Sequence, residues 1–259
     1  EFFVEEYKRV IFAINKENLN ANISIKPTAF GLLLDREKGL ENISKICELA
    51  AKTDIFVRLD MEDHRVTQDT IDVVLEMHSR NLTNVGCVLQ SRLFRTKEDI
   101  QKICEITKGS ADFRLCKGIY LEPPEISHTD YQSIVESFCS DIDLALDLDA
   151  YVGIASHDLK VINYAKDALK SRNLGPGVMD GRMNSPKNRI GKGEGYEFQF
   201  LLGVRGNVRR KLADEGHLTR VYIPYGSQWY EYSMRRLREN PDIAWHVFKA
   251  MIFPWNNRR

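Results

Sequence analysis

Short apolar segments alternate with amphipathic segments along almost the whole chain, and this order constrains the fold more than any other feature. The apolar segments, such as 84–91 (NVGCVLQS), have the length of strands, and the segments between them carry apolar residues at helical spacing. A strict order of strand then helix implies parallel strands joined by right-handed crossovers. Strands are therefore predicted at 21–27, 54–61, 84–91, 111–120, 150–157, 196–203 and 219–226.

The predicted fold class is α/β, with a (βα)8 barrel as the leading architecture and an open doubly wound sheet as the alternative. The 259 residues suit a single domain, 1–259. An eighth strand would have to lie in a poorly patterned segment. The chain contains neither GxGxxG nor GxxxxGK[ST], which weakens the open-sheet interpretation. Residues 173–195, rich in glycine, asparagine, proline and basic residues, are expected to form a mobile loop.

Composition narrows the classes of partner. Lysine plus arginine and aspartate plus glutamate each number 37, so charge gives no support for a nucleic-acid partner. No apolar run approaches the ~20 residues of a membrane span, so no transmembrane segment is expected. The 5 cysteines lie mostly in apolar stretches, which favours reduced core thiols. The chain begins inside a helix-like segment, so some N-terminal residues are expected to be missing.

Polar residues occupy one face of several predicted strands, where the interior of a barrel is normally apolar. Ser24 and Lys26 alternate with isoleucines, Arg58 and Asp60 alternate with Val57 and Leu59, and a third set lies in the segment EFQFL. Such residues near strand ends are typical of the catalytic end of a barrel. Because buried charge must be paired, Lys26 and Asp60 are predicted to be partners. A structural layer of ion pairs is the alternative.

The segment YIPYGSQWYEYSMRRLREN (222–240) predicts a turn followed by a short helix. On that helix Tyr232, Arg235 and Arg236 share one side, and Glu239 lies within reach of both arginines. Two positioned guanidinium groups suit a carboxylate or phosphate. A solvated helix face with internal ion pairs is the alternative.

Two further segments carry chemistry that the residues alone leave open. Lys117 lies beside Gly118 in RLCKGIYLE and could form a Schiff base. His157 ends a strand in IASHD, where a catalytic, cofactor-binding or capping role is equally consistent. The other histidines show no metal-ligand spacing, so no metal site is predicted.

As a set, the motifs ISIKPTAFG, RLDMED, VLQSR, RLCKGIYLE, IASHD, YEFQFLLGV and RVYIPYGSQWYEYSMRRLREN resemble the proline dehydrogenase family, from about residue 21 to residue 240. The likeness is to the single-function enzymes, because no aldehyde dehydrogenase part is present. It implies a distorted (βα)8 barrel that binds FAD and oxidises L-proline to Δ1-pyrroline-5-carboxylate. Electrons would pass to a quinone at a membrane surface. The expected location is the bacterial cytoplasm, peripheral to the inner membrane, or alternatively the matrix side of the mitochondrial inner membrane.

The resemblance also implies roles for individual residues. The proline carboxylate would be bound by Arg235, Arg236 and Lys26, with Asp60 and Glu239 positioning these cations. The pyrrolidine ring would be walled by Tyr120, Leu201, Tyr222 and Tyr232, and FAD would be contacted by Gln90, Arg114, Lys117, Ser156 and His157. The chain departs from the family pattern at Ile119, where alanine is usual, and at Cys116, where a valine is usual beside the flavin.

Two other functions remain open at this point. A Schiff-base lyase or aldolase would use Lys26 or Lys117 as its nucleophile. A non-catalytic barrel would bind a ligand without turnover, although the retained Arg235, Arg236 and Lys26 argue against that reading.

Overall fold

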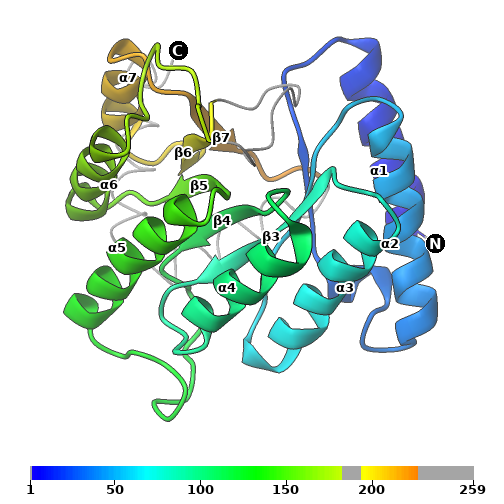
Figure 1. Cartoon of the computed structure of the whole chain (residues 1–259). Coiled ribbons are helices and arrows are strands. Elements are labelled where there is room, and N and C mark those ends of the chain that lie inside the picture. The colour runs from blue at the N-terminus through cyan, green and yellow to red at the C-terminus, as the bar shows by residue number, and fades with distance from the viewer. Residues whose placement is uncertain (1, 183–193, 227–259) are drawn as a thin grey trace.

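The computed structural model describes residues 2–182 and 194–226. Its centre is one parallel sheet of 7 strands, which follow one another in chain order from β1 to β7. Helices cover the outer side of this curled sheet, and the β4–α5 loop lies lowest in Figure 1. The strands are β1 (Ile23–Ile25), β2 (Val57–Leu59), β3 (Val85–Gln90), β4 (Asp112–Cys116), β5 (Tyr151–Ala155), β6 (Tyr196–Leu201) and β7 (Thr219–Tyr222).

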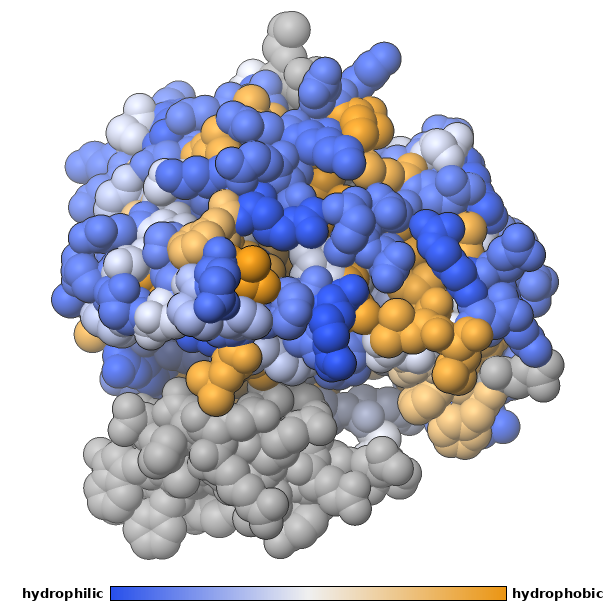
Figure 2. All heavy atoms as spheres, turned by 90° about the horizontal axis from the view of Figure 1, so that it is seen from below, coloured by the Kyte–Doolittle hydropathy of each residue, from blue (hydrophilic) through white to orange (hydrophobic). Residues whose placement is uncertain are grey.

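The view from below shows the side of the molecule on which the β4–α5 loop lies. Most of the described surface on this side is hydrophilic, and apolar residues form separate patches between polar ones (Figure 2). Among the helices of the described ranges, none is long and apolar enough to cross a membrane.

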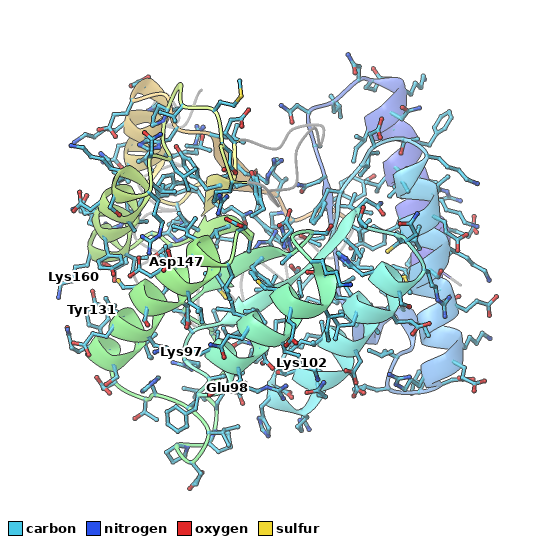
Figure 3. All side chains as sticks on the ribbon, viewed as in Figure 1. Lys97, Glu98, Lys102, Tyr131, Asp147 and Lys160 are labelled. Atoms are coloured by element: carbon cyan, nitrogen blue, oxygen red, sulfur yellow. The ribbon has the colours of Figure 1, made fainter. Side chains whose placement is uncertain are left out.

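Three of the helices begin at an aspartate cap. Asp35, Asp130 and Asp158 each accept a hydrogen bond from a backbone N–H in the first turn of the following helix. On α4, the charged side chains of Lys97 and Lys102 lie on the outer surface (Figure 3). The helices are α1 (Phe2–Lys16), α2 (Arg36–Ala51), α3 (Thr67–Ser79), α4 (Thr96–Thr107), α5 (Tyr131–Asp147), α6 (Leu159–Ser171) and α7 (Gly206–Asp214), with short 3-10 turns η1 (Pro27–Phe30) and η2 (His64–Val66).

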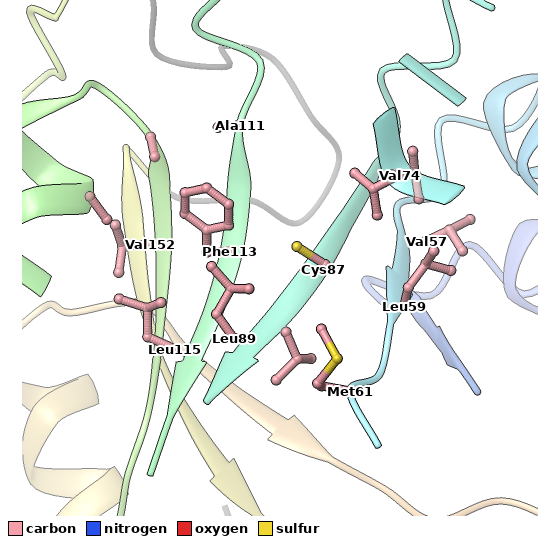
Figure 4. Packing of buried hydrophobic residues seen from close by; sticks show 14 of the residues in the cluster. Val57, Leu59, Met61, Val74, Cys87, Leu89, Ala111, Phe113, Leu115 and Val152 are labelled. Carbon is pink, nitrogen blue, oxygen red and sulfur yellow. The ribbon is translucent and has the colours of Figure 1, made fainter. Parts of the chain in front are cut away.

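The hydrophobic core lies between the sheet and its helices. Alternate residues of each strand, such as Leu59, Cys87 and Phe113, point outward into this layer and are fully buried (Figure 4). Because side chains alternate across a strand, the intervening positions point to the inside of the curled sheet. All 5 cysteines are free thiols, as predicted.

The sequential strand order confirms the α/β parallel sheet and argues against the open doubly wound alternative, which requires a reversal of strand order. Each strand falls inside its predicted range. Within the described residues the ladder ends at β1 and β7, and no eighth strand joins them. Side chains span the interior instead: the Tyr222 hydroxyl donates to Asp60, and Arg114 donates to Ser24.

The described ends of the 173–195 segment lie away from the carboxyl ends of the strands. Arg182 donates to the backbone carbonyls of Leu146 and Ala150, each at 3.1 Å, immediately before β5 begins. The prediction that this loop is mobile concerns chiefly residues 183–193, which lie outside the described residues.

Candidate active site

The interior of the curled sheet holds a connected polar cluster centred on Arg114 of β4. Its guanidinium donates to Asp60 Oδ1 at 2.6 Å, to Gln199 Oε1 at 2.6 Å and to Ser24 Oγ at 3.0 Å. The side chains of Arg114 and Asp60 are 11% and 14% exposed. Charges this deep are stable only when they are paired and hydrogen-bonded, and this geometry satisfies both conditions.

Asp60 uses its second oxygen as well. The Tyr222 hydroxyl of β7 donates to Oδ2 at 2.9 Å, and the Arg114 guanidinium carbon lies 5.1 Å from the centroid of the Tyr222 ring. This tyrosine therefore contacts both members of the ion pair, which places it over the cluster as a cation–π partner.

The predicted ion pair between Lys26 and Asp60 is wrong in this structure. Asp60 pairs with Arg114, and Lys26 occupies the N-cap position of η1 without an ion pair to Asp60. The physical reason is reach: the rigid guanidinium of Arg114 bonds three acceptors at once, including the carboxylate that Lys26 was expected to bind.

A second layer of buried ion pairs lies next to this cluster, toward the amino ends of the strands. We call this layer, formed by Glu197 with Arg220 and by Arg58 with Asp112, the floor of the site. Glu197 accepts both Nε and Nη2 of Arg220, at 2.7 and 2.8 Å, and also the Tyr151 hydroxyl at 2.9 Å. Arg58 pairs with Asp112, and both side chains are almost fully buried. For Arg58 and Glu197 the alternative of a structural ion-pair layer is therefore supported. Their partners Asp112, Arg220 and Tyr151 were not singled out from sequence, although each lies on a predicted strand.

Two glycines make room for these polar side chains. A Cβ on Gly153 of β5 would lie 2.4 Å from the Gln199 amide nitrogen, and one on Gly86 of β3 would lie 2.9 Å from a guanidinium nitrogen of Arg58. Any side chain at either position would displace the cluster or its floor. The missing side chains are the sequence signal that could have located this network.

Lys117 turns away from Arg114, as their strand parity requires. Its ammonium lies 2.5 Å from Asp158 Oδ2, beside the start of α6. β4 ends at Cys116, and Gly118 has a φ of +91°, a left-handed conformation that glycine adopts without strain. The chain therefore bends at Gly118, immediately after Lys117.

The other predicted cofactor residues lie at the carboxyl ends of β3 and β5. Gln90 donates to the Glu62 carbonyl at 2.6 Å, while its buried Oε1 has no partner among the described residues. Ser156 accepts the backbone N–H of Asp158 at 3.1 Å, and His157 accepts that of Leu201 at 3.1 Å. Because Asp158 is the cap of α6, the capping alternative for His157 is wrong.

Cys116 and Ile119 depart from the family pattern without forming reactive groups. Burial raises the pKa of the Cys116 thiol to about 11, which keeps it protonated and unreactive. Ile119 is 54% exposed, so its extra bulk is not packed into the interior. The backbone carbonyl of the next residue, Tyr120, accepts a hydrogen bond from Arg92, which was not singled out from sequence.

The predicted carboxylate clamp lies outside the described residues. Tyr232, Arg235, Arg236 and Glu239 all fall in 227–259, so their roles stay predictions. Across 2–182 and 194–226, no group of three or more histidine, cysteine, aspartate or glutamate side chains could hold a metal ion.

The sequence matches known proteins over nearly its whole length. A sequence profile of the family described as "Proline dehydrogenase" matches residues 1–247. Proline dehydrogenase 2 of Bacillus subtilis (strain 168) is 33% identical over 247 residues, which span 95% of this chain and 75% of the relative. Proline dehydrogenase of Deinococcus radiodurans is 30% identical, with 96% and 76% covered.

Solved structures show the same fold. Proline utilization A (PutA) from Bdellovibrio bacteriovorus, inactivated by N-propargylglycine, superposes with a TM-score of 0.76 at 19% identity. That superposition covers 91% of this chain and 28% of the PutA chain, so the chain corresponds to a minor part of that longer protein. At such identity the likeness establishes the fold of the chain and nothing further.

Proposed function

Since the chain belongs to the proline dehydrogenase family, we propose that it is a flavoenzyme that oxidises L-proline to Δ1-pyrroline-5-carboxylate. FAD is the proposed hydride acceptor and a quinone the proposed electron acceptor. This reaction would open proline catabolism. The bacterial relatives support a location in the bacterial cytoplasm, at the surface of the inner membrane.

One observation carries the proposal. The Arg114–Asp60–Tyr222 cluster places charge and an aromatic ring inside the curled sheet, at the carboxyl ends of the strands where barrel enzymes build their sites. The interior of a barrel is normally filled with branched apolar side chains, so a polar cluster at this level departs from the usual packing. The cluster supports a polar, oriented substrate.

The residues present fit FAD. The unpartnered Oε1 of Gln90 is a buried acceptor that an N–H group of a flavin ring would satisfy. Arg114 supplies positive charge inside the curled sheet, and Lys117 supplies it just after the carboxyl end of β4. When bound, FAD supplies the chemistry of hydride acceptance from the carbon next to the proline nitrogen.

The chain's own residues would bind and orient the substrate. Lys26, with Arg235 and Arg236, is assigned to the substrate carboxylate, since paired cations fix a carboxylate's position and direction. Tyr120, Leu201, Tyr222 and Tyr232 are assigned to the wall that excludes water around the ring, with Glu239 positioning the arginines.

The test uses the purified chain with FAD and L-proline. We expect a yellow protein absorbing near ~450 nm, loss of that band on anaerobic addition of proline, and its return on addition of a soluble quinone. A colourless protein on which borohydride traps a substrate aldehyde or ketone at Lys26 or Lys117 would instead establish the Schiff-base alternative. Flavin binding without reduction by proline would contradict the proposed substrate.

A further inference from the structure

Lys117 is held from two directions by groups that the proposed function does not use. Its ammonium lies 2.5 Å from Asp158 Oδ2 and 4.4 Å from the centroid of the Tyr131 ring. The Tyr131 hydroxyl donates to the same Asp158 oxygen at 2.7 Å. Lysine, carboxylate and phenol therefore form a closed triangle.

The triangle sits where two helices begin. Tyr131 is the first residue of α5, and Asp158 immediately precedes α6. Lys160 of α6 lies 5.3 Å from the Tyr131 ring centroid, and the two residues are neighbours in Figure 3. Within the described residues, the starts of two helices thus supply two groups that contact the Lys117 ammonium, the Asp158 carboxylate and the Tyr131 ring.

The two carboxylate oxygens of Asp158 have different hydrogen-bond partners. Oδ1 accepts the Lys160 backbone N–H at 2.9 Å and caps α6, while Oδ2 is left for Lys117 and Tyr131. Burial acts to raise the pKa of Asp158, but the hydrogen bonds from Lys117 and Tyr131 outweigh it, so the pKa is lowered and the group is a carboxylate at neutral pH.

The position of Lys117 in the chain explains why contacts are needed to hold its side chain in one conformation. It follows the last residue of β4 and precedes Gly118, whose φ is +91°. A four-carbon side chain at such a turn would otherwise sample many rotamers. The entropic cost of ordering it would then reduce the affinity for a ligand. An ammonium has three N–H donors, so binding Asp158 leaves others free for a ligand.

We propose that Asp158 and Tyr131 are positioning residues that hold Lys117 ready to contact FAD. The inference rests on the proposed function, in which Lys117 contacts FAD, and it extends that function to residues that need not touch the cofactor. Asp158 fixes the ammonium directly. Tyr131 fixes it through its ring and through its hydrogen bond to Asp158.

The first experiment measures the dissociation constant of FAD for the cofactor-free protein by fluorescence titration. Asp158→Asn keeps an oxygen that can cap α6 but loses the charge, and should weaken FAD binding about tenfold, in line with the loss of a charged hydrogen bond. Asp35→Asn is the matched control, because Asp35 also caps a helix, accepting the Lys38 N–H at 3.0 Å, but no lysine ammonium of the described residues pairs with it. It should leave FAD binding unchanged.

A double variant separates positioning from general loss of stability. If Asp158 acts through Lys117, adding Asp158→Asn to Lys117→Met should weaken FAD binding no further than Lys117→Met alone. The inference would be overturned if the two substitutions together weakened FAD binding by the product of their separate effects. It would also be overturned if Asp158→Asn bound FAD with wild-type affinity. A wild-type protein that binds no FAD would overturn the proposed function, and this inference with it.

A second measurement follows the lysine itself in the cofactor-free protein. Tyr131→Leu removes ring and hydroxyl, whereas Tyr131→Phe keeps the ring, so labelling of Lys117 by an amine-reactive reagent should rise several-fold in the first and less in the second. Lys45, which pairs with Glu41 on α2, is the internal control for the reagent. Equal labelling of Lys117 in wild type and Tyr131→Leu would contradict the proposed role of Tyr131.

Discussion

Arg114 of β4 reaches across β3 to Asp60 at the end of β2, with 2.6 Å between its Nη1 and the Asp60 Oδ1. The two strands are not neighbours in the sheet, so only the curvature of the sheet brings these side chains together. The pair consequently depends on the whole of β2, β3 and β4 being in register, and it ties the proposed site to the fold.

Replacing Asp60 by asparagine should lower kcat/KM for proline by at least tenfold. The change leaves the Arg114 guanidinium without its carboxylate, and truncating one partner of a desolvated charge pair costs about 2–5 kcal/mol. Steady-state kinetics with L-proline measures this loss. The control is Asp63→Asn on the same loop, where the carboxylate pairs with the largely exposed Arg65. Similar losses in both variants would show that the loop, and not the pair, is responsible.

The floor of the site should be important for stability and not for chemistry. Arg58→Met removes the ion-pair partner of the buried Asp112 carboxylate and should lower the free energy of unfolding by about 3–5 kcal/mol. Urea unfolding followed by circular dichroism gives this value. Adding Asp112→Leu should restore most of the loss, because the buried carboxylate is then gone as well; a double variant as unstable as Arg58→Met would contradict this role of the ion pair.

The choice between proline and 4-hydroxyproline should depend on Tyr222. Tyr222→Ser removes the ring and should raise the preference for hydroxyproline, because it opens space and supplies a hydroxyl partner. The same change removes the hydrogen bond to Asp60 seen at 2.9 Å, so activity with both substrates should also fall. Tyr222→Phe keeps the ring and loses the hydroxyl that donates to Asp60. Kinetics with both substrates should therefore show an altered preference for Tyr222→Ser alone; an unchanged ratio would remove Tyr222 from the substrate wall.

A buried carboxyl outside the site should make stability depend on pH. Asp141 of α5 is fully buried, and its two oxygens have no hydrogen-bond partner among the described residues. Burial raises its pKa to about 7, against smaller opposing effects of Ser91 and Lys97. The unfolded pKa is about 4, so the folded state binds more protons between these values, and stability falls as the pH rises through that window.

Asparagine at position 141 removes this dependence. The free energy of unfolding of Asp141→Asn, minus that of wild type, should increase by on the order of 2 kcal/mol between pH 5 and pH 8. Urea unfolding of both proteins at the two pH values measures the gain. A constant difference between the proteins would mean that Asp141 does not titrate in this range.

The sequence predicted the elements well because each carries its own local signal. In 54–61 and 84–91, apolar residues of one parity face the helices, and the observed strands fall inside both ranges. Pairing across the interior has no such signal. Asp60 was matched with Lys26 from the adjacent strand, whereas the reach of an arginine two strands away decided the outcome. His157 was considered as a cap, and the true cap is the next residue.

The partners of buried charges were the least predictable part of the site. Asp112 lies between an alanine and a phenylalanine, and Arg220 lies between a threonine and a valine, so the adjacent residues do not indicate what either one binds. Gly86 and Gly153 give a usable signal in retrospect, since a glycine inside a predicted strand marks a close approach. Such glycines restrict where polar side chains can be accommodated, but they do not identify them.

The carboxylate clamp can be tested against a second arginine pair in the same chain. Arg235→Met and Arg236→Met should each raise KM for proline strongly while FAD stays bound, because each removes a cation assigned to the substrate carboxylate at a cost of about 2–5 kcal/mol. Arg209 and Arg210 are also adjacent, on α7, and Arg209→Met and Arg210→Met should leave KM unchanged. Steady-state kinetics, with the flavin absorbance of each purified variant, separates substrate binding from cofactor loss. If Arg235→Met and Arg236→Met bound proline as well as wild type, the assignment of the clamp would be wrong.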